Sequence, residues 1–337
     1  MRFSPPLRAL LAGGLLALTT ACRKDGPLVP SSNPAVVTFT QPGLYPEGVQ
    51  YDPLGRRYFV SSLTRGTIGQ VTDDGAYAPF ADDPQLISTI GLHLDLLRNR
   101  LLAAVSDPGV GQRSTAATAG QLAALASFNA RTGARQGYVN LGALRPGQDH
   151  FANDIAVDLL GNAYVTDSFS PIIYKVTVQG QVSVFYENNS LDAPAGAFGF
   201  NGIVFHPSGY LLVNHSTLGK LYRIPVGGSG APTATEVASS QSLAGADGML
   251  LQDPKTLLVV SNAQNTVFRL ASADGFTSAR VTGTFATGPN FPTTLTRRGL
   301  DVYVLYAHLD QLFGGQPAAP QFSINKVIFQ PVSGSGK

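Results

Sequence analysis

Residues 153–168 read NDIAVDLLGNAYVTDS, and this stretch decides the fold. A short apolar run is followed by a Leu-Leu-Gly-Asn turn and a second apolar run, which is the pattern of a β-hairpin. The same order of polar or small residue, strand, turn and strand recurs along the chain. The six copies are PEGVQYDPLGRRYFVSS from Pro46, IGLHLDLLRNRLLAAVSD from Ile90, NDIAVDLLGNAYVTDS from Asn153, NGIVFHPSGYLLVNHS from Asn201, DGMLLQDPKTLLVVSNA from Asp247 and PTTLTRRGLDVYVLYAH from Pro292.

The copies recur about every 45 residues with further strands between them, which is typical of β-propeller blades. No long segment with helical periodicity separates the strands, which disfavours a parallel α/β fold. Two all-β sandwiches are an alternative, but they would not explain a repeat that runs evenly through the chain. We therefore predict an all-β, six-bladed propeller over residues 35–331. The strand at 35–40 (AVVTFT) should complete the last blade and close the ring. Residues 332–337 are expected to form a flexible tail.

The composition excludes several classes of protein. Of the 337 residues, 44% are hydrophobic and 13% are charged, whereas a typical globular chain has about 25% charged residues, so the chain is not disordered. A single Cys rules out an intramolecular disulfide and a Cys-rich zinc site. The formal net charge of +2 argues against a nucleic-acid binder.

The N-terminus has the layout of a secretory signal: Arg2 and Arg8, an apolar run over residues 9–18, then Thr-Thr-Ala-Cys. The run is too short to span a membrane. Because the sole cysteine, Cys22, follows a small residue at the end of this run, residues 1–21 resemble a bacterial lipoprotein signal. An ordinary cleaved signal with an incidental cysteine is the alternative. Residues 22–34 are polar and Pro-rich and are predicted to form a tether.

This reading places the protein in a bacterial cell envelope, on the periplasmic or the outer-membrane face, with Cys22 lipidated. Removal of the two signal arginines lowers the formal net charge to zero, so no acidic partner is indicated. We expect a monomer that touches the membrane only through its lipid and binds no nucleic acid.

In a propeller the inner strand of each blade lines a central channel, so residues just before these strands meet at one mouth. They are Glu47, Ile90, Asn153, Asn201, Asp247 and Pro292. Four carry side-chain oxygens, and none is Lys or Arg, so two carboxylates would repel each other unless a cation lay between them. Oxygen ligands favour Ca²⁺ or Mg²⁺, and the five His share no metal spacing that would suit zinc. The four residues predict a divalent-cation site, most simply for Ca²⁺. Individually, Asn153, Asn201 and Asp247 could instead cap turns, and Glu47 could be a solvated loop residue.

Fourteen residues further on, the ends of the second strands should form a wider polar ring at the same face. They are Ser61, Ala104, Asp167, His215, Ser261 and Tyr306. Asp167 and His215 are candidates for proton transfer, or equally for an ordinary polar rim. The polar segment 107–120 is expected to be a long loop that overhangs this face.

The motifs PEG at 46–48, NDIAVD at 153–158, NGI at 201–203 and DG at 247–248 resemble those of the gluconolactonase family, which includes regucalcin and the luciferin-regenerating enzyme. The resemblance spans roughly residues 40–330. It implies a six-bladed propeller with one divalent cation at the channel mouth, with Glu47, Asn201 and Asp247 as ligands. It also implies that Asn153 lies at the metal and substrate site and that Asp247 is the general base.

One position departs from the family. Sugar-lactonase members can carry an Arg two residues before the Asn of the ND motif, and here that residue is Phe151, with His150 beside it. Phe198 and Phe200 are also expected at the pocket edge. A pocket of this kind suits a ligand less polar than a sugar lactone.

Three functions follow as alternatives. The first is metal-dependent hydrolysis of a lactone or ester, with Asp247, His215 and Asp167 as catalytic residues and Asn153, Phe151, His150 and Phe200 as substrate contacts. The second is a non-catalytic propeller that binds a small molecule or a protein and has a structural cation; the long loop and Phe151 favour it. The third is a metal-free structural propeller.

Overall fold

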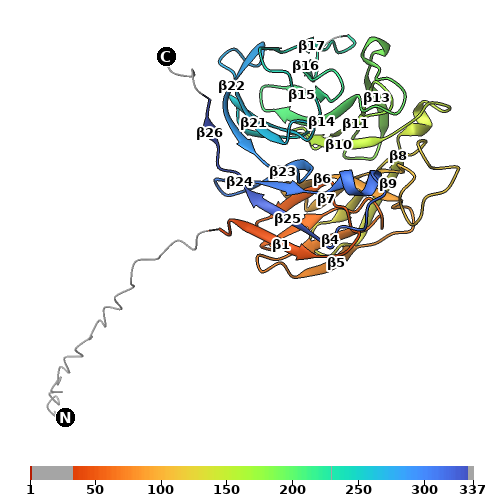
Figure 1. Cartoon of the computed structure of the whole chain (residues 1–337), viewed down its shortest axis with the longest axis vertical. Helices are drawn as coiled ribbons and strands as arrows, with labels where there is room; N and C mark the ends of the chain where they lie inside the picture. Colours follow the sequence, from red (N-terminus) through yellow and green to blue (C-terminus); the bar gives the residue numbers. More distant parts are fainter. Residues whose placement is uncertain (2–32, 229, 333–337) are drawn as a thin grey trace. The chain divides into compact units, whose positions relative to one another are not determined.

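The computed structural model describes Met1, residues 33–228 and residues 230–332. The predicted signal peptide, the lipidation site Cys22, nearly all of the tether and residues 333–337 of the tail lie outside the described residues. From Pro34 onward the chain forms one compact unit of six antiparallel sheets (Figure 1). This is the predicted six-bladed propeller. In the described part of the chain, no helix has the length and apolar character needed to cross a membrane.

Each blade is a four-stranded meander whose first strand lies innermost. Blade 1 consists of β2 (Val49–Asp52), β3 (Arg57–Val60), β4 (Ile68–Val71) and β5 (Tyr77–Ala81). Blade 2 consists of β6 (Ser88–Asp95), β7 (Arg100–Ser106), β8 (Ala123–Asn129) and β9 (Arg135–Asn140). Blade 3 consists of β10 (Ala152–Val157), β11 (Ala163–Asp167), β12 (Ile172–Val176) and β13 (Val182–Glu187).

The second half of the ring adds two short edge strands. Blade 4 consists of β14 (Phe200–His206), β15 (Tyr210–His215), β16 (Lys220–Pro225) and β17 (Thr235–Glu236). Blade 5 consists of β19 (Ala246–Asp253), β20 (Thr256–Ser261), β21 (Thr266–Ala271) and β22 (Ser278–Ala286), with β18 (Ala238–Ser239) and β26 (Gln330–Pro331) on the outer edge of β22. Helical segments are single turns: η1 (Leu96–Arg98), η2 (Gly142–Leu144), η3 (Asn189–Leu191) and α1 (Leu309–Phe313).

Blade 6 closes the ring as the sequence predicts. It consists of β23 (Pro292–Arg298), β24 (Asp301–Tyr306), β25 (Gln321–Lys326) and the N-terminal β1 (Val36–Thr40). β1 alternates exposed and buried residues, and its buried Val37 and Phe39 face the core. Phe39 lies opposite Phe322 of β25, with ring centroids 5.9 Å apart. The pairing leaves no unpaired edge between the first and last blades.

The inner strands share a β-bulge near their start. In blades 2 to 6 the register to the second strand shifts, as between Ala152 and Ile155 or between Phe200 and Ile203. A bulge redirects the side chains at that point. In blade 4 the bulged pair is Asn201-Gly202, and a Cβ on Gly202 would collide with the carbonyl oxygen of Asp247 in the next blade. In such a bulged pair the glycine therefore lets neighbouring inner strands approach closely, while the residue before it faces the channel.

The positions of the bulges show that two residues of the predicted rings are wrong. In blade 6 the bulged position is Thr293 rather than Pro292, and the Thr293 hydroxyl donates a hydrogen bond to the carbonyl oxygen of Glu47 at 2.8 Å. In blade 2 the end of the second strand is Ser106, which lies opposite Ser88, rather than Ala104. Both errors come from counting residues along strands whose bulges the sequence does not reveal.

Candidate functional site

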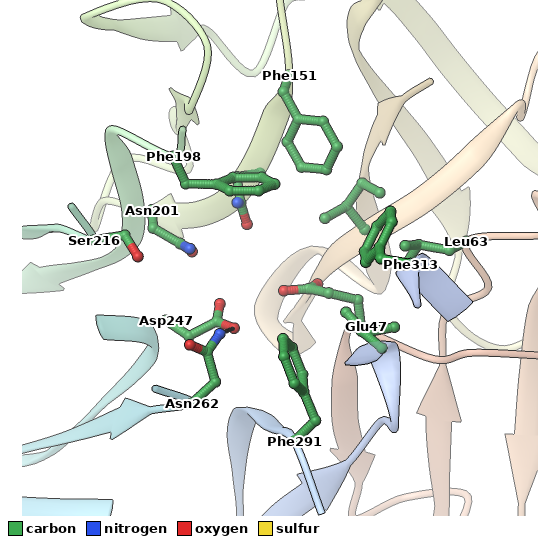
Figure 2. Close-up of a pocket in the computed structure, with 13 residues that line it drawn as sticks. Glu47, Leu63, Phe151, Phe198, Asn201, Ser216, Asp247, Asn262, Phe291 and Phe313 are labelled. Atoms are coloured by element: carbon green, nitrogen blue, oxygen red, sulfur yellow. Dashed lines mark hydrogen bonds between the residues drawn. The ribbon is translucent and has the colours of Figure 1, made fainter. Parts of the chain in front are cut away.

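A cavity of about 210 Å³ lies where the inner strands begin, at the mouth of the channel. Its floor carries carboxylates and amides, and its walls are mainly aromatic (Figure 2). It is lined by Glu47, Leu63, Ile90, Phe151, Asn153, Phe198, Asn201, Ser216, Asp247, Asn262, Phe291, Leu309 and Phe313. No Lys, Arg or His is among these residues.

The structure brings the four predicted cation ligands together in this cavity. Glu47 precedes β2, and Asn153, Asn201 and Asp247 lie at the bulges of β10, β14 and β19. All four side chains are buried. Figure 2 shows the Glu47 and Asp247 carboxyl groups and the Asn201 amide pointing into the cavity from different blades.

Several oxygen atoms of this set have no hydrogen-bond partner among the residues that the structure describes. Glu47 Oε2, Asn153 Oδ1 and Asn201 Oδ1 are buried without a hydrogen bond. Buried polar atoms without a partner are rare and each costs free energy. The Asn153 amide instead donates to Ser168 Oγ at 2.9 Å, which fixes its oxygen toward the cavity.

This donor set fits a hard divalent cation. It offers two carboxylates and two amide oxygens, the ligand types that Ca²⁺ and Mg²⁺ prefer. No cluster of three or more His, Cys, Asp or Glu suited to a metal occurs among the described residues. The site therefore resembles a mixed oxygen site and not a zinc or transition-metal site.

The buried carboxyl groups at this site have raised pKa values. Burial raises the pKa of Glu47 well above its ordinary value, and the charges of Asp247 and Asp154 raise it further. Burial and then the nearby Asp154 raise the pKa of Asp247 to about 8, against the effect of an Asn262 amide that donates to its Oδ2 at 3.0 Å. Burial raises the pKa of Asp154 to about 7. Burial is the largest cause of all three shifts, and no Lys, Arg or His is among the described lining residues to oppose it.

Asp167 and His215 do not line the cavity. Asp167 is fully buried and accepts hydrogen bonds from the backbone N–H of Phe151 at 2.8 Å and from the Tyr174 hydroxyl. His215 is also fully buried, and its Nε2 lies 2.9 Å from the carbonyl oxygen of Leu191. Both side chains thus hold loops in place, and their part in proton transfer stays a prediction.

The expected second ring lies one residue further along the chain. Successive residues of a strand point to opposite faces, and the residues after His215 and Ser261 are Ser216 and Asn262, which line the cavity. Ser168, which follows Asp167, contacts Asn153. Strand alternation was the signal that could have identified these three residues from the sequence.

Two predicted substrate contacts, His150 and Phe200, are also absent from the lining. His150 is buried, with Nδ1 2.7 Å from Asp167 Oδ2 and Nε2 2.9 Å from the carbonyl oxygen of Arg145. Burial lowers its pKa, but the hydrogen bond and charge of Asp167 outweigh this and raise it. Phe200 is fully buried beside the His215 ring.

The aromatic walls come from separate parts of the ring. Phe151 packs edge-on against Phe198, with centroids 5.3 Å apart. Phe291, and Phe313 of α1, add further aromatic rings to the lining (Figure 2). Leu309, also of α1, lines the cavity as well. The sequence carries no signal for Leu309 and Phe313, because a five-residue helix has no periodicity to detect, and Phe291 lies one residue before β23.

The long loop after β7 lies at the same face but contributes no lining residue. Asp107 organises it by accepting hydrogen bonds from Ser114 and Thr118. The Gln112 N–H donates to the carbonyl oxygen of Thr64 at 2.7 Å, beside the lining residue Leu63. The loop therefore borders the cavity and leaves it open.

Comparisons with known proteins extend this description. No family model and no curated protein matches the sequence. Among solved structures, the chain is similar to the Malassezia sympodialis allergen Mala s 1 (TM-score 0.70, 19% identity, 88% of this chain and 96% of that chain). It is also similar to a luciferin-regenerating enzyme (TM-score 0.60, 13% identity, 89% and 98%). A third similar structure is the Xanthomonas campestris gluconolactonase XC5397 (TM-score 0.58, 14% identity, 87% and 89%). The neighbours are thus six-bladed propellers of the kind that the sequence motifs indicated, and at these identities they establish the fold alone.

Proposed function

We propose that Glu47, Asn153, Asn201 and Asp247 bind a divalent cation, Ca²⁺ in the first place, and that the cavity above them hydrolyses a lactone or ester with an apolar substituent. The buried, unpartnered oxygens of Glu47, Asn153 and Asn201, which face one cavity, carry the proposal. A lactonase and a luciferin-regenerating enzyme among the structural neighbours are consistent with it.

A bound cation would supply Lewis acidity to a carbonyl oxygen and lower the pKa of a water molecule. The protein residues do the rest. Asp247 and Glu47 are the carboxyl groups among the described lining residues, and in this proposal Asp247 accepts a proton from water. The amide of Asn153, fixed by Ser168, orients the substrate. Phe151, Phe198 and Phe313 bind its apolar part and exclude water.

A non-catalytic binding propeller with a structural cation is the second candidate, and one observation favours it. Asp247 already accepts a hydrogen bond from Asn262, and His150 and His215 point elsewhere. In this candidate the cavity binds a small apolar ligand without turnover.

The experiment is a Ca²⁺ titration of chelator-treated protein by calorimetry, followed by hydrolysis assays on gluconolactone, an aromatic lactone and an aryl ester. We expect near-stoichiometric binding that Glu47→Gln weakens at least about tenfold, and turnover of the aromatic substrates only. Binding without any turnover supports the second candidate. Absence of Ca²⁺ and Mg²⁺ binding in the folded protein contradicts both.

We also propose that the protein is a lipoprotein of a bacterial envelope, anchored through Cys22. The support is the order of basic residues, apolar run and sole cysteine at the N-terminus. Mass spectrometry of membrane-extracted protein should show an acylated N-terminal cysteine, and Cys22→Ala should release the protein from the membrane fraction. An unmodified Cys22 in the mature chain contradicts the anchor.

A further inference from the structure

Large apolar side chains are exposed on the hairpins that join the first and second strands of four blades. Blade 1 exposes Leu54, blade 2 Leu97, blade 3 the pair Leu159-Leu160 and blade 6 Leu300. Their exposed fractions are 79%, 90%, 71%, 76% and 90%. Single exposed leucines are ordinary on a protein surface, but repeated placement on equivalent hairpins is not.

These hairpins all lie on the face opposite the cavity. The cavity residues stand where the inner strands begin, and the hairpins stand where the same strands end. Contacts between hairpins show that the tips are neighbours around the channel. The Arg98 guanidinium donates to the carbonyl oxygen of Leu159 at 3.2 Å, and Arg297 donates to that of Gln252 at 3.0 Å. We call this surface, defined by Leu54, Leu97, Leu159, Leu160 and Leu300, the leucine face.

Exposed cations stand between the leucines. Arg56, Lys255 and Arg297 are exposed, and the ion pairs of the described residues include no acidic partner for any of them. Asp253 is the exposed acid on the six hairpins between first and second strands, and the outer turns at the same face add the exposed Asp74 and Asp274. Apolar tips with Lys and Arg near them are the pattern of proteins that rest on anionic lipid, where leucines enter the interface and cations meet headgroups.

The chain enters the propeller at this same face. The carbonyl oxygen of Pro34 accepts a hydrogen bond from the Tyr303 hydroxyl at 2.8 Å. The carbonyl oxygen of Ala35 accepts one from the Lys326 N–H, and Lys326 Nζ pairs with Asp301, the neighbour of Leu300. The residues from Cys22 to Asn33 can reach at most about 40 Å even when fully extended. A membrane anchor at Cys22 would therefore keep the leucine face near the bilayer.

We infer that the leucine face docks on the surface of an anionic lipid bilayer and holds the cavity toward the aqueous side. The occupant is lipid because the apolar contacts are separate hairpin tips with cations near them, and because the chain enters the propeller beside them at residues 34–35. This goes beyond the sequence expectation that the lipid anchor is the sole membrane contact. It is also independent of any activity of the cavity.

The test places a polarity-sensitive fluorophore at one position of the full-length chain. In a Cys22→Ser background, which leaves no other thiol, Leu97→Cys reports the leucine face. Leu218→Cys, in the turn between β15 and β16 on the cavity face, is the matched control. Vesicles of phosphatidylcholine with phosphatidylglycerol should blue-shift the Leu97 probe, and nitroxide-labelled lipid should quench it several-fold more than the control probe.

Two further variants sharpen the result. Arg56→Gln/Lys255→Gln/Arg297→Gln should remove the dependence on phosphatidylglycerol, and Leu54→Ser/Leu159→Ser/Leu300→Ser should reduce quenching of the Leu97 probe at least about threefold. Equal quenching at both probe positions, or equal response to vesicles of phosphatidylcholine alone, would overturn the inference. A shift at the Leu97 probe caused by envelope protein but not by lipid would also overturn it, and would assign the face to a protein partner.

Discussion

At the scale of single residues, the buried carboxyl groups of the candidate site lower the stability of the cation-free fold. Asp247 is buried, and its pKa is raised to about 8 because burial and Asp154 both disfavour its charge. Burial is also the main reason why the pKa of Glu47 is raised. Without a cation, the folded protein at neutral pH binds protons at these groups that the unfolded chain would release, and this difference lowers its stability.

Asp247→Asn is therefore expected to stabilise the cation-free protein. The amide keeps the shape of the side chain and removes the buried acid, so the free energy of unfolding in chelator should rise by about 1–3 kcal/mol at pH 7. The same variant should lose most of its stabilisation by Ca²⁺. Urea unfolding in chelator and in Ca²⁺ measures both effects. A variant destabilised in chelator would show that Asp247 has a structural role that needs its charge.

His93 gives a second prediction, about pH. It lies on β6 and lines a second cavity between the inner strands, together with Asp154 and Gln50. Burial lowers its pKa to about 4, against the charge of Asp95, while Arg100 lowers it further. The unfolded chain binds this proton near pH 6.5, so its stability contribution is present above that pH and is lost as pH falls toward 4.

His93→Gln should therefore flatten the acid side of the stability profile. We expect the variant to lose about 1–2 kcal/mol less than the parent between pH 6.5 and pH 4. Unfolding at several pH values measures this, with His206→Gln as a control histidine in a hairpin turn. Parallel profiles of parent and His93→Gln would contradict the assigned pKa.

At the scale of elements, the sequence predicted strands better than the exact residues that face the channel. Alternating apolar runs and Gly turns identified the hairpins, because these signals are local. The bulges at Asn153, Asn201 and Asp247 are set by the close approach of a neighbouring blade, which no local pattern encodes. The sequence also did not indicate helix α1, because this helix is short and starts after His308, which has a positive φ of 52°.

The closing strand β1 gives the prediction at this scale. Phe39 is 1% exposed and packs on Phe322, whereas Val36 of the same strand is 47% exposed. Phe39→Ala should cost about 3–5 kcal/mol, and Val36→Ala less than about 0.5 kcal/mol. Deletion of residues 35–40 should abolish cooperative unfolding, because β25 would then have a free edge. Thermal unfolding compares the three. A cooperative, unshifted transition in the deletion variant would contradict closure by this strand.

At the scale of the whole molecule, the ring separates two surfaces. Because every inner strand runs in the same direction, residues at its start gather at the cavity and residues at its end gather at the leucine face. The four proposed cation ligands come from blades 1, 3, 4 and 5, so one bound ion would cross-link most of the ring. The proposed function and the stability of the fold are thereby linked.

This linkage gives the last prediction. A cation that binds only the folded ring adds about 1.4 kcal/mol for each tenfold rise in its concentration above Kd. The melting temperature should therefore climb with the logarithm of Ca²⁺ concentration and show no plateau, and Glu47→Gln should shift the onset to higher concentration. Phe39→Ala weakens the closure of the ring by strand β1 without touching the site. The melting temperature of this variant should start lower and rise with Ca²⁺ concentration at a similar slope. Calorimetric scans at constant ionic strength, with KCl in place of CaCl₂ as the control, measure these slopes. A melting temperature that does not respond to Ca²⁺ or Mg²⁺ would show that the ring closes without a cation and that the four residues serve another purpose.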